Sequence, residues 1–155
     1  MKVSIKHLEA MRFSATTSKG ESFVIDCPTI SPIEYFLSGL IACSASDIVM
    51  MAQNKEASLS NLSVDGEVVR ADEHPRKFTS LHLLYSFDSD ADETMAKRWV
   101  QASIETYCST INTVRESVHI TYSLILNTKS LADHEKIISG EGGGVDLGKI
   151  DACCS

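Results

Sequence analysis

Cysteine is the residue type whose positions in this 155-residue sequence point most directly to chemistry. Cys43 lies in the apolar stretch 39–45, and Cys108 lies near the end of a second helical pattern. A single thiol in an apolar helix usually fills space in a core. Two thiols on the chain's two best helical patterns can instead form a redox couple, because a second thiol can capture an oxidised first thiol as a disulfide. Cys43 and Cys108 are therefore the candidate catalytic residues.

The other common catalytic signatures are missing from the sequence. It contains no dinucleotide-binding G-x-G-x-x-G, no phosphate-binding P-loop, no H-E-x-x-H and no C-x-x-C. The five histidines are scattered, and His82 and His119 are expected as half-exposed strand residues. The sequence thus predicts no metal site and no bound cofactor, which leaves thiol chemistry.

Composition and charge narrow the classes of partner. The chain is 43% hydrophobic and 23% charged, and its net charge is -7. Nucleic acids and anionic membranes select for basic surfaces, so neither is an expected partner. No uninterrupted apolar run approaches the roughly 20 residues that span a bilayer, and the alternating segment 1–7 does not resemble a signal peptide. We therefore expect a cytoplasmic protein, in which thiols stay reduced.

The element that positions the first cysteine is a long helix with strong start signals. Ser31 is the predicted N-cap, Pro32 occupies the first helical position, and Glu34 completes a capping box. The helical pattern continues to about residue 53. Because so little charge lies between Glu34 and Asp47, this helix is predicted to be buried nearly all round.

Alternation of apolar and polar residues predicts the strands. Segment 3–25 indicates an N-terminal meander, segment 62–87 a hairpin, and segment 118–126 a final strand. A second helix is predicted from near Asp90, and its apolar stripe includes Cys108. Strands and helices each cluster along the chain. The predicted fold class is therefore α+β, with antiparallel sheets packed around two long helices that each carry a cysteine.

The chain is predicted to form one domain, residues 1–127, followed by an extension of different composition, residues 128–155. Most of the eight glycines lie within 139–149, and the sequence ends in Cys153-Cys154-Ser155. Residues 131–138 are predicted to form a short helix, and the rest of the extension is predicted to be flexible.

Four segments of this sequence, in order, resemble the landmarks of one family. They resemble the osmotically inducible protein C / organic hydroperoxide resistance (OsmC/Ohr) superfamily, and within it the YhfA-like branch. The resemblance covers roughly residues 1 to 126 and implies an OsmC-like fold in an intertwined homodimer, with the cysteine helix of each chain in a shared core. The segments are Ser31-Pro32-Ile33-Glu34, the helix from Gly39 through Cys43 to Val49, Pro75-Arg76-Lys77-Phe78 and Tyr107-Cys108-Ser109.

The resemblance also implies a reaction. Cys43 would attack an organic (alkyl or lipid) hydroperoxide and become a sulfenic acid, and Cys108 would resolve it to a disulfide. An external dithiol, such as a lipoyl protein, would then reduce the disulfide. Peroxidases of the family activate the first cysteine with an arginine from an N-terminal strand loop and a glutamate directly after the helix-start proline. The nearest counterparts here are Lys19 or Arg12, and Glu34, which lies one position later.

Two alternatives remain open at the level of sequence. The same fold could serve a non-peroxidatic protein that binds a small apolar molecule or a sulfur species. A sulfur carrier or redox relay could instead use the adjacent pair Cys153-Cys154, in which any disulfide between neighbours is strained and labile.

Overall fold

A computed structural model of the chain describes residues 1–137. The chain divides into two compact units, Met1–Gly39 and Leu40–Ser155. The Gly-rich stretch and Cys153-Cys154, for which the sequence predicts flexibility or a relay, lie outside the described residues.

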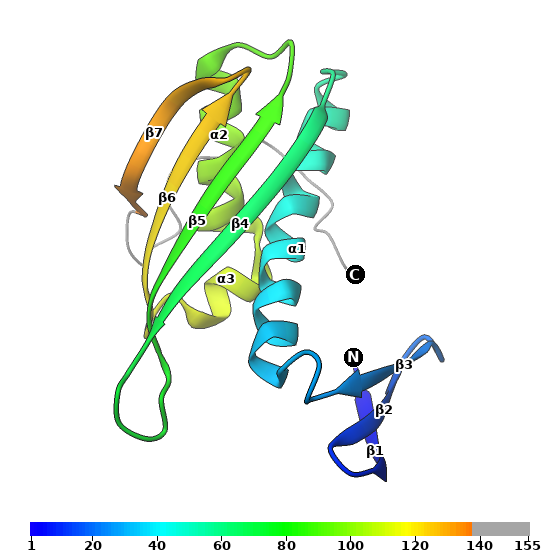
Figure 1. The fold of residues 1–155 in the computed structure, drawn as a ribbon. Coiled ribbons are helices and arrows are strands. Elements are labelled where there is room, and N and C mark those ends of the chain that lie inside the picture. The colour runs from blue at the N-terminus through cyan, green and yellow to red at the C-terminus, as the bar shows by residue number, and fades with distance from the viewer. Residues whose placement is uncertain (138–155) are drawn as a thin grey trace. The chain divides into compact units, whose positions relative to one another are not determined.

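The first unit contains a three-stranded antiparallel sheet. Its strands are β1 (Val3–Glu9), β2 (Arg12–Thr17) and β3 (Ser22–Asp26), which pair in the order β1-β2-β3 (Figure 1). The predicted N-terminal meander is confirmed. Only Ala15 of this sheet is fully buried in the single chain, and several apolar side chains are exposed, among them Val3, Ile5, Phe23 and Val24.

Helix α1 (Pro32–Asn54) begins where the capping signals predict. The backbone N–H of Ser31 donates to the Glu34 carboxylate at 2.7 Å, and the Glu34 N–H donates to the Ser31 hydroxyl at 3.3 Å. This reciprocal pairing satisfies donors that a helix start would otherwise leave open. By length and composition alone α1 could also cross a membrane, a test that core helices of water-soluble proteins pass as well.

The second unit is built on a four-stranded sheet with the order β4-β5-β6-β7. Its strands are β4 (Ser60–Arg70), β5 (Phe78–Asp88), β6 (His119–Leu126) and β7 (Lys129–Lys136). β4 and β5 form the predicted hairpin, and β6 is the strand predicted at 118–126, although it is not the final strand because β7 follows it.

The prediction of purely antiparallel sheets is wrong at one pairing, because β5 and β6 run parallel. A helical segment lies between them in the sequence. Such a crossover carries the chain back to the end at which β5 began, whereas a short turn would have produced an antiparallel pair.

The predicted short helix at 131–138 is also wrong. Residues 131–136 belong to β7, which pairs antiparallel with β6 and adds a fourth strand to the sheet beyond residue 127. Asn127 and Thr128 form the tight connection, both with positive φ. A short apolar pattern fits a helix or a strand equally well, and the free edge of β6 decided between them.

The second helix is broken and not continuous as predicted. It consists of α2 (Glu93–Ala102), a π-helical turn η1 (Ser103–Tyr107) and α3 (Ser109–Val114). Asp92, rather than Asp90, caps its start by accepting the Met95 N–H at 2.8 Å. Cys108 has an extended backbone conformation between η1 and α3. The prediction of two long cysteine-bearing helices therefore holds for α1 alone.

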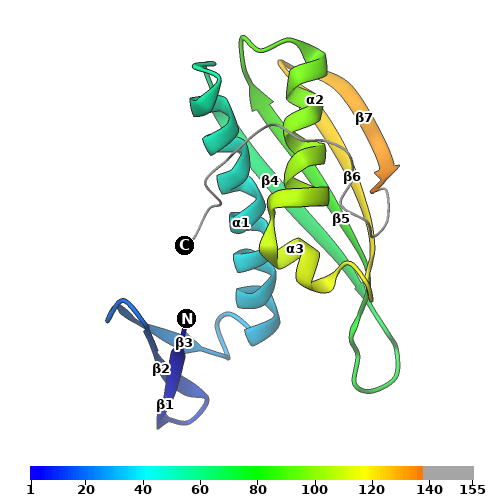
Figure 2. The same cartoon turned by 180° about the vertical axis from the view of Figure 1, so that it is seen from behind.

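The helices of the second unit cover one face of its sheet, as Figure 2 shows from behind. The core between the helices and the sheet contains Leu81, Leu83, Tyr85, Phe87 and Trp99, each at most 1% exposed. The prediction that α1 is buried nearly all round is wrong for the single chain, since one stripe is buried and Phe36 is 50% exposed. The buried stripe consists of Leu40, Cys43, Ser44, Asp47, Ile48, Met51 and Ala52.

Candidate functional site

Folding brings the two predicted cysteines together. Cys43 lies on the buried stripe of α1 and is 7% exposed, whereas Cys108 is fully buried at the break between η1 and α3. Both are free thiols, and they lie close enough for each to shift the pKa of the other. A contact between two free thiols is the arrangement from which a disulfide can form.

The surroundings of Cys43 favour its thiolate. Burial raises the pKa of Cys43, but hydrogen bonds outweigh burial, and the pKa lies below its ordinary value. The donors are the hydroxyl and backbone N–H of Thr110, then the thiol of Cys108 and the hydroxyl of Ser109, whose oxygen lies 3.8 Å from the sulfur. Donors that favour the charged form lower a pKa without a cation.

The hydroxyl of Thr110 can serve either form of Cys43. It donates to the Leu40 carbonyl at 3.3 Å and lies 3.2 Å from the Cys108 sulfur. A hydroxyl has one proton and rotates to its best acceptor. Toward the Cys43 sulfur, this hydroxyl is the largest of the causes that lower the pKa of Cys43.

Cys108 has the opposite character. Burial is the main cause that raises its pKa to about 12, and the neighbouring Cys43 raises it further. A fully buried thiol with a raised pKa stays protonated at neutral pH and is a poor first nucleophile. The two thiols are therefore electronically distinct, with Cys43 the more acidic of the pair.

A buried polar network lies next to the thiols on α1. Ser44 Oγ bonds the Tyr85 hydroxyl and, at 2.9 Å, Ser103 Oγ, while Ser103 donates to the Asp47 carboxylate at 2.9 Å. Asp47 is 1% exposed, and burial raises its pKa to about 6 despite the bond from Ser103. The network joins α1, β5 and the start of η1.

The predicted supporting residues Arg12, Lys19 and Glu34 belong to the first unit. Arg12 forms ion pairs there with Glu9 at 2.8 Å and with Asp26 at 3.5 Å. Glu34 is engaged in the helix cap, where its bonds with Ser31 hold its pKa below the ordinary value. The cap that the sequence predicts for Glu34 is confirmed, and the role of these three residues toward Cys43 stays a prediction.

Sequence reasoning missed the residues that touch the thiols. Ser109 and Thr110 directly follow Cys108, and an isolated Asp47 in an apolar helix was a visible signal of a buried polar site. Ser103 carried no signal, because only the π-helical turn aims it at α1.

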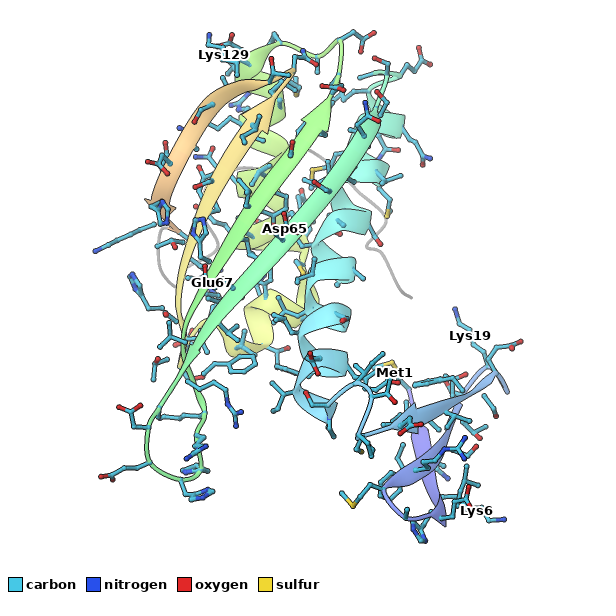
Figure 3. All side chains as sticks on the ribbon, in the orientation of Figure 1. Met1, Lys6, Lys19, Asp65, Glu67 and Lys129 are labelled. Carbon is cyan, nitrogen blue, oxygen red and sulfur yellow. The ribbon has the colours of Figure 1, made fainter. Side chains whose placement is uncertain are left out.

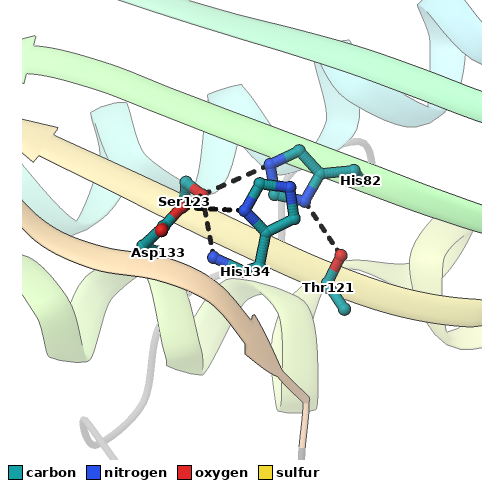
Figure 4. A network of polar contacts seen from close by, with 5 residues as sticks. All are labelled: His82, Thr121, Ser123, Asp133 and His134. Atoms are coloured by element: carbon teal, nitrogen blue, oxygen red, sulfur yellow. Dashed lines mark hydrogen bonds and ion pairs between the residues drawn. The ribbon is translucent and has the colours of Figure 1, made fainter.

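A second polar cluster lies on the sheet face that the helices leave open. There His82 stacks on His134 with ring centroids 4.0 Å apart, and its two ring nitrogens lie 2.8 Å and 3.3 Å from the hydroxyls of Thr121 and Ser123 (Figure 4). A groove of about 440 Å³ over this face is also lined by Asp65 and Glu67 of β4 (Figure 3). Burial, and then the neighbouring His134, lowers the pKa of His82.

Within residues 1–137, no group of three or more His, Cys, Asp or Glu side chains is arranged to hold a metal ion.

Thr110→Val is expected to slow alkylation of Cys43 by iodoacetamide at pH 7 by roughly 3- to 10-fold, the effect of one lost hydrogen bond to a thiolate. The pKa of Cys43 should rise, because the hydroxyl of Thr110 is the largest of the causes that lower it. Thr113→Val in the same helix is the matched control, since its hydroxyl donates to the Ser109 carbonyl and, among the described residues, to no thiol. Equal rates in wild type and Thr110→Val would show that the hydroxyl does not stabilise the thiolate.

The fold and the thiol pair define an α+β protein with a two-cysteine site between a long helix and a broken one. Residues 26–123 match the family described as OsmC-like protein, and the chain belongs to this family.

Individual relatives agree with this assignment. The chain is 28% identical over 128 residues to Protein YhfA of Escherichia coli strain K12, which covers 79% of this chain and 96% of YhfA. Its structure is similar to an OsmC-like protein from Mycoplasma pneumoniae, with a TM-score of 0.69, 19% identity, and coverage of 81% and 95% of the two chains. It is also similar to the organic hydroperoxide resistance protein OhrB of Bacillus subtilis, with a TM-score of 0.52, 19% identity, and coverage of 79% and 96%. At these identities the two structural likenesses show a shared fold.

Proposed function

We propose that the protein reduces organic hydroperoxides with Cys43 as the attacking thiol and Cys108 as the resolving thiol. The observation that carries this proposal is the contact between two thiols of opposite character. Cys43 has a lowered pKa and Cys108 a strongly raised one. This difference in pKa suits a reaction in which a thiolate attacks first and a protonated thiol attacks second.

The reaction proceeds in three balanced steps. The Cys43 thiolate attacks the outer peroxide oxygen, so that an S–O bond forms and the O–O bond breaks. The alkoxide leaves and takes a proton from water to become the alcohol. The Cys108 thiol then attacks the sulfenic sulfur, an S–S bond forms, and the hydroxyl leaves as water with the thiol proton. An external dithiol reduces the disulfide by thiol–disulfide exchange and becomes a disulfide itself.

The names of structural relatives support this chemistry. Proteins of the same fold from Bacillus subtilis and Legionella pneumophila are called organic hydroperoxide resistance proteins. These names favour an antioxidant role in the response to oxidative stress. The expected substrate is an alkyl or lipid hydroperoxide.

The exposed apolar surface of the first unit supports a homodimer. Val3, Ile5, Phe23 and Val24 are 46% to 56% exposed in the single chain. A small three-stranded sheet with so many exposed apolar side chains is marginal alone and marks an interaction surface. We propose that a second copy of the chain covers this surface in an intertwined dimer, and that the dimer works in the cytoplasm with a lipoyl protein or another dithiol as reductant.

A second candidate is a protein that binds a small apolar molecule or a sulfur species without reducing peroxide. The ion pairs of Arg12 with Glu9 and Asp26, and the capping bonds of Glu34, favour it, because both residues have partners other than a thiol. A purified protein that retains such a molecule while Cys43 fails to react with hydroperoxide would support this candidate.

Cys108→Ser is expected to change the product of oxidation and not its first step. With one equivalent of cumene hydroperoxide, wild type should lose two hydrogens as an intramolecular Cys43–Cys108 disulfide. Cys108→Ser should instead hold a sulfenic acid on Cys43, which dimedone traps, because no second thiol captures it. Intact-protein and peptide mass spectrometry distinguish the two products.

Excess hydroperoxide provides the complementary measurement. It should drive Cys108→Ser to the irreversible sulfinic acid while wild type stays at the disulfide. If wild type forms no Cys43–Cys108 disulfide under hydroperoxide, the proposed role of Cys108 is wrong.

A further inference from the structure

We propose that Asp47 is a positioning residue that holds the Cys108 segment against Cys43 through Ser103. The proposal rests on the proposed function, since it concerns the same thiol pair. Asp47 lies about one helical turn beyond Cys43, on the same buried stripe of α1. The helix that presents the first thiol therefore also presents the carboxylate.

The first link is the contact between α1 and the start of the π-helical turn. Ser103 Oγ donates to the Asp47 carboxylate at 2.9 Å and also approaches the Ser44 carbonyl at 3.4 Å. Ser103 is fully buried, and Asp47 is 1% exposed. A charge-assisted bond between two buried groups is stronger and more directional than one in water.

The second link runs from Ser103 to the second thiol. The Cys108 backbone N–H donates to the Ser103 carbonyl at 2.8 Å, which closes the wide turn of η1. One residue therefore binds Asp47 with its side chain and Cys108 with its backbone. Wide turns of this kind recur at functional sites in helices.

The sheet anchors the network from a third side. Ser44 Oγ bonds both Ser103 Oγ and the hydroxyl of Tyr85 on β5, a fully buried residue. Three elements thus meet at one polar cluster beside the thiols. The cluster restrains η1 in distance and in rotation relative to α1.

A buried carboxylate at this position is unfavourable for folding. Burial opposes the charged form of Asp47, and its pKa is raised as a result. Perturbed carboxylates of this kind cluster at functional sites. The role that the contacts support is positional, because the carboxylate bonds Ser103.

Positioning matters most in the step that forms the disulfide. The Cys108 thiol must reach the oxidised sulfur of Cys43, form the S–S bond and release water. The effective concentration of one thiol toward the other measures how well the fold holds them, and it falls steeply with misplacement. Asp47 is therefore expected to raise that effective concentration.

The test is the equilibrium between dithiol and Cys43–Cys108 disulfide in glutathione redox buffers, with full-length protein and without hydroperoxide. Asp47→Ala should lower the effective concentration at least about tenfold relative to wild type. Asp47→Asn keeps an acceptor for the Ser103 hydroxyl and should stay within about threefold of wild type. Ser46→Ala is the control, because within residues 1–137 that hydroxyl bonds the Ala42 carbonyl of its own helix and no other group.

Ser103→Ala tests the same contact from the donor side and serves if Asp47→Ala does not fold. A wild-type effective concentration in Asp47→Ala, or in Ser103→Ala where the first is insoluble, overturns the inference. Failure of Asp47→Asn to restore the value also overturns it, since a retained acceptor should suffice. The assay contains no peroxide, so a wild type that forms the disulfide but consumes no hydroperoxide overturns the proposed function and leaves this inference standing.

Discussion

Cys43→Ser is expected to consume organic hydroperoxide at least about 10³-fold more slowly than wild type, because a serine hydroxyl stays protonated at neutral pH and cannot accept the peroxide oxygen reversibly. The hydroxyl should fit the site, since serine is close in size to cysteine and the neighbouring donors are hydroxyl, thiol and backbone groups. The measurement is the loss of cumene hydroperoxide with dithiothreitol as reductant, at equal protein concentration.

Cys27→Ser provides the matched control for this experiment. Cys27 is a free, partly exposed thiol of the first unit. The Cys27→Ser variant therefore tests whether loss of a thiol outside the site slows peroxide consumption. The replacement should leave the rate unchanged. Should Cys43→Ser keep the wild-type rate, Cys43 is not the attacking thiol, and the proposed mechanism is wrong.

The second large effect is on the free energy of unfolding. Asp47 has a raised pKa of about 6 in the folded chain, against an ordinary value of 3.8. A carboxyl of this kind contributes stability that is fully present below its ordinary pKa and is lost as the pH rises through its folded pKa. The amide introduced by Asp47→Asn does not titrate. The free energy of unfolding of Asp47→Asn, relative to wild type, should therefore rise by about 2 to 3 kcal/mol between pH 4 and pH 8.

Urea unfolding at the two pH values, at one fixed protein concentration, measures this difference. Asp90→Asn is a control of opposite sign, since bonds from Ser58 hold the pKa of exposed Asp90 below its ordinary value. A difference between Asp47→Asn and wild type that is the same at both pH values would show that Asp47 does not titrate as a buried carboxyl. The expected rise in stability of Asp47→Asn at high pH is also consistent with the finding that functional sites often reduce the stability of a protein.

Local signals were sufficient for much of the fold. The capping box at Ser31 and Glu34 predicted the start of α1, and strand alternation predicted the meander and the β4–β5 hairpin. These features depend on residues close together in the chain, so their causes are visible in the sequence. The family resemblance was confirmed over residues 26–123.

Features that depend on distant residues were predicted less well. The parallel pairing of β5 with β6 follows from the crossover helices, and β7 forms because β6 offers a free edge. The break before Cys108 is invisible in an apolar stripe, since a π-helical turn changes the backbone spacing without a distinctive residue type.

The sequence by itself determined that the chain carries a capped apolar helix with Cys43 and a later helical segment with Cys108. Only the tertiary structure decided what surrounds the two thiols. Thr110 lies 3.3 Å from the Leu40 carbonyl across the fold, and Ser103 reaches Asp47 from a segment far along the chain. The acidity of a thiol depends on donors and burial in three dimensions, which no local pattern encodes. The two cysteines were therefore predictable, whereas the groups that make Cys43 acidic and Cys108 inert were not.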